Sequence, residues 1–132
     1  RAEVYNFNLS NKNSTFKIEA KHNGFKRFGL IHNRSLKIKE NELSIKDKIY
    51  GKSILPSYIR FYLNHDIKVK RLKSNRLNLY LKNKKLAMIY SSNNISIIDK
   101  YQNLEFNKSQ KTILLLIKIT NNTENHFNAK FN

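Results

Sequence analysis

Four histidines and nine acidic residues are the side chains of this 132-residue sequence that could support acid–base or metal chemistry. The histidines, His22, His32, His65 and His126, are widely separated, and no two have the spacing of a zinc-ligand pair. There is no Cys, so neither a disulfide nor a thiolate metal site can form. The sequence also has no Gly-rich phosphate-binding loop. We therefore assign no catalytic residue, no metal site and no cofactor to this chain.

Charged residues that are predicted to face inward occur in the two alternating runs 30–38 and 43–49. Side chains two residues apart lie on the same face of a strand, so His32 and Arg34 share the face of the apolar residues that follow them. Asp47 shares the inward face of the second run by the same rule. A hairpin turning at residues 40–41 predicts the pairs Ile38–Leu43, Leu36–Ile45, Arg34–Asp47 and His32–Ile49.

The predicted Arg34–Asp47 pair has two explanations. As a structural ion pair it would lock the register, because a one-residue slip would place Arg34 opposite Lys46 or Lys48. Removing one partner of such a buried pair typically costs about 3–5 kcal/mol. Alternatively, Arg34 and His32 line a groove that binds polysaccharide. Since Asp47 is matched with Arg34, no inward carboxylate pair remains for a glycosidase.

Basic residues dominate the surface, and the net charge is +17. A charge of that size attracts nucleic acid, anionic polysaccharide or anionic lipid. The 20 Lys, 20 Asn and 15 Ile, against six Arg, are also what A/T-rich codons would produce, so composition alone is the competing explanation. Lys68 and Lys70 lie in the densest basic run and join His32 and Arg34 as candidate substrate contacts. A solvated edge strand protected by Lys is the alternative for that run.

The elements that must position these residues are strands, because apolar residues recur at every second position and turn signals recur about every ten residues. We predict an all-β fold, an antiparallel two-sheet β-sandwich. Residues 113–117 are apolar on both faces and predict a central strand, whereas residues 121–132 predict a short edge strand. The inward positions are expected to be Tyr5, Phe7 and Leu9; Phe16, Ile18 and Ala20; Ile59, Phe61 and Leu63; Ile67 and Val69; Leu77, Leu79 and Leu81; and Leu86, Met88 and Tyr90.

Residues 1–132 are expected to form a single domain, because the sequence has no linker or repeat and its length is ordinary for one core. The longest apolar run is too short to span a membrane. The chain begins with Arg1 rather than Met, which we interpret as a piece of a longer protein. Most aromatic residues fall in the inward phase, which argues against the exposed stacking pairs that single-stranded nucleic acid requires.

Several of these segments resemble the C-terminal β-sandwich of heparinase II/III-like polysaccharide lyases. That family shows a His-x-Gly-aromatic segment, a His-x-Arg strand, a strand with an inward Asp and a following Gly, and a later aromatic and histidine-rich strand, whose final proline is missing here. Further matches are Arg1-Ala2 and a Tyr-x-x-x-Glu-Phe element. The matching segments are His22-Asn23-Gly24-Phe25, His32-Asn33-Arg34, Leu43-Ser44-Ile45-Lys46-Asp47 with Gly51, Phe61-Tyr62-Leu63-Asn64-His65, and Tyr101-Gln102-Asn103-Leu104-Glu105-Phe106.

The resemblance implies a parent enzyme with an N-terminal α/α toroid domain followed by this β-region, in a bacterial periplasm or secreted. Such enzymes cleave uronic-acid polysaccharides by β-elimination, in which a base removes the C5 proton and an acid protonates the leaving oxygen. The family's catalytic and metal-binding residues lie upstream, so none is carried over. The implied role of this piece is structural or groove-supporting, with acidic polysaccharide as partner. The alternative is a stand-alone carbohydrate- or polyanion-binding β-module without catalysis.

Overall fold

The computed structural model describes residues 3–105 and 108–132, so Arg1, Ala2 and Phe106, which contributed to the resemblance, lie outside the described residues. One short 3-10 turn, η1 (Lys26–Phe28), precedes the third strand. In the described ranges, no helix is long and apolar enough to cross a membrane. The strands are β1 (Val4–Lys12), β2 (Thr15–His22), β3 (Leu30–Lys39), β4 (Glu42–Gly51), β5 (Ser57–Tyr62), β6 (Ile67–Lys73), β7 (Arg76–Leu81), β8 (Lys84–Ser91), β9 (Ile95–Glu105), β10 (Lys108–Ile119) and β11 (Glu124–Phe131).

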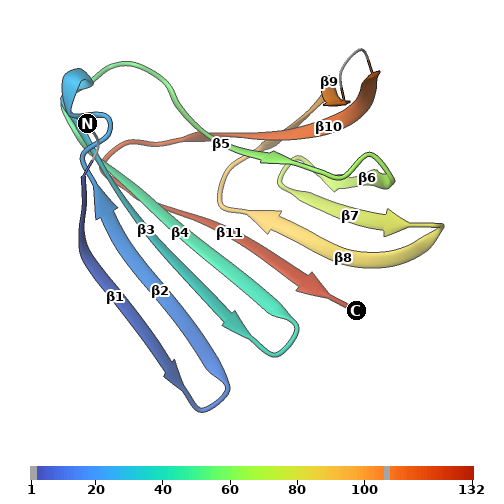
Figure 1. The fold of residues 1–132 in the computed structure, drawn as a ribbon, viewed down its shortest axis with the longest axis horizontal. Coiled ribbons are helices and arrows are strands. Elements are labelled where there is room, and N and C mark those ends of the chain that lie inside the picture. Colours follow the sequence, from blue (N-terminus) through green and yellow to red (C-terminus); the bar gives the residue numbers. More distant parts are fainter. Residues whose placement is uncertain (1–2, 106–107) are drawn as a thin grey trace.

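The strands form two antiparallel sheets of unequal size, which confirms the predicted all-β two-sheet sandwich (Figure 1). The larger sheet has eight strands in the order β1-β2-β3-β4-β11-β8-β7-β6. The smaller sheet has three, in the order β5-β10-β9. As predicted, the doubly apolar segment 113–117 belongs to β10, the central strand of the smaller sheet, and Lys68 and Lys70 lie on β6, an edge strand.

The core lies between the smaller sheet and the β4, β11, β8 and β7 part of the larger one. Leu115 and Ile117 of β10 are fully buried there, and the ring of Phe61 stacks on Phe127 with centroids 4.2 Å apart. Burying one such side chain typically contributes about 1.5–3 kcal/mol. The other buried apolar residues of this core are Leu30, Ile45, Ile49, Ile59, Leu77, Leu79, Ile89, Ile95, Ile119 and Ala129.

The β3–β4 hairpin has the predicted register. Ile38 pairs with Leu43, Leu36 with Ile45, Arg34 with Asp47, and His32 with Ile49. The turn falls at residues 40–41, where Glu40 has φ 52°. Because apolar residues already occupy one face of both strands, a one-residue slip would interrupt that face.

The prediction for the inward face of β1 was wrong before its bulge, where Tyr5 pairs with Lys21 on the outer face, whereas Leu9 pairs with Ile18 on the inner face. Tyr5, Phe7 and Leu9 were expected inside, but Phe7 is 63% exposed and Leu9 53% exposed. A β-bulge interrupts the β1–β2 ladder between Tyr5 and Asn8, and Asn6 has φ 52°. A bulge shifts the side-chain parity, so an alternation that is regular in sequence is not regular in space.

The inward face of β8 was wrongly predicted for two of three residues. Leu86, Met88 and Tyr90 were expected inside; Leu86 does pack against the core, but beyond it Ala87 and Ile89 are the buried residues. Both parities of this strand are apolar, so periodicity did not discriminate between them. The β7–β8 hairpin decides, because it pairs Ile89 with the buried Leu77 and Ala87 with Leu79.

The C-terminal strand was predicted at an edge but lies inside the larger sheet. β11 pairs with β4 on one side and with β8 on the other (Figure 1). Its inward residues Asn125, Phe127 and Ala129 are buried, and its polar character comes from the outward residues between them. A polar outer face is compatible with a central strand when only one face of the sheet is covered.

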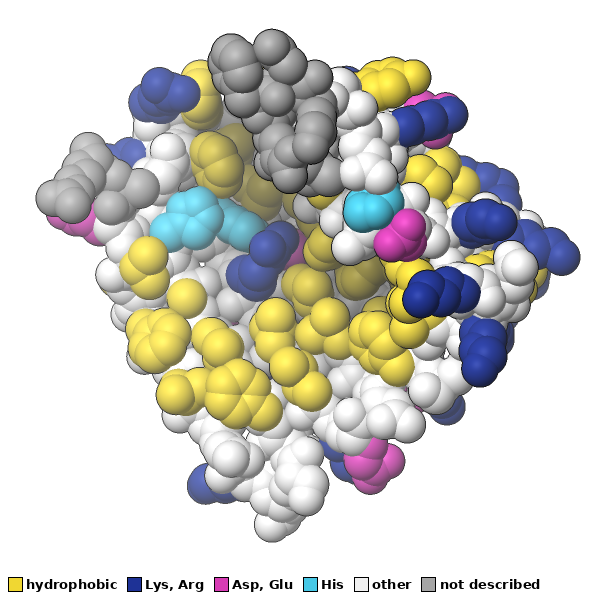
Figure 2. All heavy atoms as spheres, turned by 45° about the vertical axis from the view of Figure 1, so that its right-hand side comes forward, with side chains coloured by type: hydrophobic (Ala, Val, Ile, Leu, Met, Phe, Trp, Pro, Cys, Tyr) yellow, Lys and Arg dark blue, Asp and Glu magenta, His cyan; other side chains and the backbone are white. Residues whose placement is uncertain are grey.

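The larger sheet extends past the smaller one, so part of its inner face is uncovered. Leu9 and Ile38 both lie on the inner face, where they pair with Ile18 and Leu43, yet Ile38 is still 43% exposed. Figure 2 shows hydrophobic side chains gathered in a hollow beside histidine and basic side chains. The uncovered part therefore presents an apolar surface.

Two glycines allow the start of β3 to approach the end of β4. Gly29 has φ 70° and closes η1 by donating its N–H to the carbonyl oxygen of Lys26 at 2.9 Å. Gly51 has φ 141°, and a Cβ at that position would overlap the carbonyl oxygen of Gly29. A larger residue at position 51 would therefore force the backbone at Gly29 to shift, because the clash is with a carbonyl group and not with a flexible side chain.

We expect Gly51→Ala to lower the free energy of unfolding by about 2–3 kcal/mol, because it adds both backbone strain and a backbone clash. Gly29→Ala is the matched control: it has a positive φ but open space around its Cβ, so we expect a loss of about 1 kcal/mol. Urea denaturation of both variants measures the difference. A Gly51→Ala loss no larger than that of Gly29→Ala would contradict the close approach.

Candidate functional site

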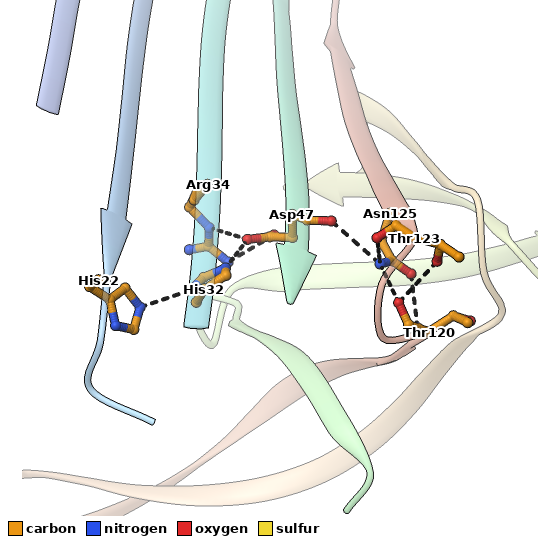
Figure 3. A network of polar contacts seen from close by, with 7 residues as sticks. All are labelled: His22, His32, Arg34, Asp47, Thr120, Thr123 and Asn125. Carbon is orange, nitrogen blue, oxygen red and sulfur yellow. Dashed lines mark hydrogen bonds and ion pairs between the residues drawn. The ribbon is translucent and has the colours of Figure 1, made fainter. Parts of the chain in front are cut away.

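Four polar residues meet on the inner face of three adjacent strands, β2, β3 and β4 (Figure 3). His22 of β2 stands directly opposite His32 of β3, and Arg34 of β3 stands opposite Asp47 of β4. Each of them takes the inner face by the same alternation that places the neighbouring Leu and Ile residues. The sheet therefore brings together residues that are up to 25 positions apart in sequence.

The four side chains form one continuous chain of hydrogen bonds. His22 Nε2 lies 2.8 Å from His32 Nδ1, and His32 Nε2 contacts Asp47 Oδ1. Arg34 donates from Nε to Asp47 Oδ1 at 2.8 Å and from Nη2 to Oδ2 at 3.0 Å. The side chain of Asp47 is fully buried, whereas that of Arg34 is 42% exposed. The carboxylate is therefore held from two sides by groups that differ in their access to solvent.

One assignment of protons satisfies every bond in this chain. An ionised Asp47 can only accept, so His32 donates from Nε2. His32 Nδ1 then accepts the proton of His22 Nε2, and His22 Nδ1 accepts the backbone N–H of Gly24 at 3.2 Å. Both imidazoles are neutral in this arrangement. Protonating either one removes the acceptor on which the previous bond depends.

The environment of the network lowers the pKa of both Asp47 and His22. Burial raises the pKa of Asp47, but hydrogen bonds from His32 and Arg34 outweigh it and hold that pKa below its ordinary value. Burial, with smaller contributions from His32 and Arg34, lowers the pKa of His22 below its usual value. The folded chain therefore favours an ionised carboxylate and a neutral His22.

A second polar group supports Asp47 from β11. Asn125 is buried, and its Nδ2 donates to the carbonyl oxygens of Asp47 at 3.4 Å, Thr120 at 3.0 Å and Thr123 at 3.1 Å (Figure 3). Its Oδ1 accepts from the backbone N–H of Thr120 and from Nδ2 of Asn93. This amide connects the turn between β10 and β11 to β4, the strand that carries Asp47.

A cavity of about 370 Å³ opens beside the network, between the start of β5 and the inner face of β2 and β3. The network contributes His22, His32 and Arg34 to its wall, and β5 contributes Arg60. Aromatic and apolar residues complete the lining. These are Phe25, Phe28, Leu30, Ile49, Leu55, Pro56, Tyr58, Ile59 and Ile119, with Ser57. The cavity thus offers cationic donors next to hydrophobic rings.

The structure brings His32 and Arg34 together but not Lys68 and Lys70. These lysines lie on the outer face of β6, and five strand spacings separate β6 from β3, or about 24 Å. Their contact with substrate stays a prediction. Among the described residues, no group of three His, Asp or Glu side chains is placed to hold a metal ion.

Sequence reasoning assigned no role to two residues of this site, His22 and Asn125. His22 stands two positions after the inward Ala20, so parity could have placed it beside His32 once β2 and β3 were paired. Asn125 gave no such signal, because β11 was expected at an edge. The role of Asn125 depends on the position of β11 between β4 and β8 in the larger sheet.

The network predicts loss of stability in mild acid. The folded pKa of His22 is below the unfolded value, so its contribution is fully present above about pH 6.5 and is lost as the pH falls toward the folded pKa. We expect the free energy of unfolding to fall between pH 7 and pH 5, measured by urea denaturation. His22→Gln, which keeps an N–H donor toward His32, should flatten this dependence.

His65→Gln is the matched control, since His65 lies outside the network. It should leave the pH dependence as in the parent chain. An equal flattening in both variants would show that His22 has no special part in acid sensitivity.

The sequence matches a known family, and the fold matches solved structures. A family model described as heparinase II/III-like, C-terminal, matches residues 3–129. No curated protein matches the chain. Among solved structures, a mutant of the heparan sulfate lyase HepC from Pedobacter heparinus superposes with a TM-score of 0.80 at 14% identity, over 98% of this chain and 21% of that one.

Two structures of a heparinase III superpose similarly, one of them with methylated lysines. Their TM-scores are 0.77 and 0.76 at 6% identity, again over 98% of this chain and 21% of theirs. The chain therefore spans about a fifth of the length of these lyases, and the likeness shows a shared fold. Since the family model covers nearly all of the sequence, the chain belongs to the heparinase II/III-like C-terminal family.

Proposed function

We propose that this chain is the C-terminal β-sandwich of a polysaccharide lyase that cleaves an acidic, uronic-acid-containing polysaccharide by β-elimination. Within that enzyme the chain supports the fold and lines the substrate groove. The observation that carries the proposal is the cavity beside the His22–His32–Asp47–Arg34 network, where cationic donors face a space of about 370 Å³. Family membership and the names of the solved lyases point to the same substrate class.

Arg34 is the residue best placed to meet a uronate carboxylate. Asp47 engages its Nε and Nη2, and no residue of the described part of the chain bonds its Nη1. Arg60 lines the other side of the cavity, and its guanidinium lies 5.8 Å from the ring centre of Tyr58. A cavity lined by two arginines suits an anionic sugar, because planar guanidinium donors match carboxylate oxygens.

The same network is poorly suited to supply the base of a β-elimination. Both ring nitrogens of His22 and of His32 already take part in hydrogen bonds. Accepting a proton from substrate would break one of these bonds, and the lowered pKa of His22 opposes it further. We therefore place the acid–base chemistry in the remainder of the parent enzyme, outside this chain.

The uncovered inner face of the larger sheet supports a larger parent. Leu9 and Ile38 expose apolar surface where a second layer would normally lie. In the proposal, further parts of the lyase cover this surface, and an α/α toroid domain stands next to the cavity. A stand-alone binding module, the alternative function, would leave the same surface in water.

The test is to express the longest reading frame that encodes this chain and assay it on heparan sulfate, heparin and other uronic-acid polysaccharides. We expect ultraviolet-absorbing unsaturated uronate products. Arg60→Ala should raise KM about fivefold or more, equivalent to about 1 kcal/mol, with a smaller change in kcat, because it removes a binding contact and no reacting group.

Arg76→Ala is the control, since Arg76 lies at the start of β7 and away from the cavity, and should leave KM unchanged. Lys68→Ser with Lys70→Ser tests the remaining predicted contacts in the same assay. Absence of unsaturated product from every uronic-acid polysaccharide, together with glycan binding by the 132-residue chain alone, would favour the stand-alone module.

A further inference from the structure

A second, larger groove lies on the opposite face of the same sheet. Alternate residues of β3 serve the two faces: His32 and Arg34 point inward, whereas Asn33, Ser35 and Lys37 point outward. The outward residues of β1, β2, β3, β4 and β11 line a groove of about 690 Å³. Neither the family resemblance nor the cavity beside Arg34 accounts for it.

The groove is basic and rich in hydrogen-bonding groups. Two carboxylates, Glu19 and Glu124, stand among its lysines, and each already pairs with one, at 3.1 Å with Lys17 and 3.2 Å with Lys46. Hydroxyl and amide side chains such as Ser35 fill the positions between the charges. The five lysines are Lys12, Lys17, Lys37, Lys46 and Lys48.

Two of these lysines oppose each other directly. Lys17 of β2 pairs with Lys37 of β3 in the ladder, and Ser44 stands on the other side of Lys37. Like charges directly opposite each other destabilise a sheet. Within the described ranges, Lys37 has no carboxylate partner. An anion bound between Lys17 and Lys37 would relieve this repulsion.

The chemistry of the groove favours a polysaccharide over a nucleic acid. The two aromatic rings among the residues that line the groove already have partners: the ammonium group of Lys48 lies 4.8 Å from the ring centre of Tyr50, and His126 lies 3.0 Å from Glu124. Single-stranded nucleic acid is held mainly by stacking on aromatic rings, for which this groove offers no free pair within the described residues. Lysines alternating with hydroxyls and amides suit a chain that carries both acidic groups and sugar hydroxyls.

We propose that the outer groove of the larger sheet binds a segment of acidic polysaccharide, with Lys17 and Lys37 at its centre. The site is distinct from the cavity beside Arg34, because the sheet itself separates the two. It holds the polymer without reacting with it. The inference goes beyond the proposed function and does not depend on lyase activity.

Replacing both opposed lysines should leave the stability of the chain unchanged or higher while weakening its binding to the polymer. In Lys17→Ser with Lys37→Ser, the repulsion disappears, so the urea midpoint should equal or exceed that of the parent chain. Affinity for a size-defined heparin oligosaccharide, measured by titration calorimetry, should fall about fivefold or more. The salt dependence of binding should also become shallower, since fewer cations contact the polymer.

The matched control is Lys100→Ser with Lys118→Ser, which removes the same charge from exposed positions on the smaller sheet. We expect its heparin affinity to stay within about twofold of the parent. Equal losses in both double variants would overturn the inference and show that overall charge alone attracts the polymer. The inference would also be overturned if the unsubstituted 132-residue chain did not bind heparin.

Two further outcomes separate the competing explanations. Tighter binding to a DNA oligonucleotide of equal charge, with the same dependence on Lys17 and Lys37, would assign the groove to nucleic acid and overturn the inference. If Arg60→Ala weakens heparin binding while Lys17→Ser with Lys37→Ser does not, the outer groove is excluded and the proposed function stands. Loss in the lysine variant alone supports the outer groove.

Discussion

The buried carboxylate of Asp47 is the constraint on which this half of the sandwich depends. A charge removed from water must be compensated by charged or polar partners, since an isolated one costs many kcal/mol. Arg34 supplies two donors and His32 supplies a third, while Asn125 bonds the backbone carbonyl of the same residue. These partners come from β3 and β11, the two neighbours of β4. The Asp47 carboxylate thus specifies the pairing with β3, and its backbone carbonyl adds a bond to β11.

The same constraint places the network in the wall of a cavity as well as in the framework of the sheet. Arg34 is only partly buried, so one side of its guanidinium satisfies Asp47 and the other borders the cavity. His22 extends the network toward Phe25, whose ring centre lies 5.4 Å from the imidazole. The residues that hold the strands in register also shape the wall of the proposed groove. The structural and the groove-lining explanations of Arg34 are therefore compatible.

The larger sheet presents three surfaces with different chemistry. Its inner face is covered by the smaller sheet on one side, and the uncovered side, near Leu9 and Ile38, remains apolar. Its outer face is basic and polar around Lys37. Since strand side chains alternate, one strand contributes to an inner and an outer surface at once. In the proposals above, the covered inner surface forms the core, the uncovered inner surface contacts the rest of the lyase, and the outer surface binds the polymer.

The sequence by itself determined the strands, the β3–β4 register and the pairing of Arg34 with Asp47, because period-two alternation and one tight turn are local properties. It placed Met88 and Tyr90 of β8 on the wrong face, since Ala87 and Ile89 alternate with equally apolar residues, and it could not show the bulge at Asn6. Only the tertiary structure decided that β11 inserts beside β4 and that His22 meets His32. Those contacts join strands that are distant in sequence, and their energy comes from packing and hydrogen bonds that no single segment contains.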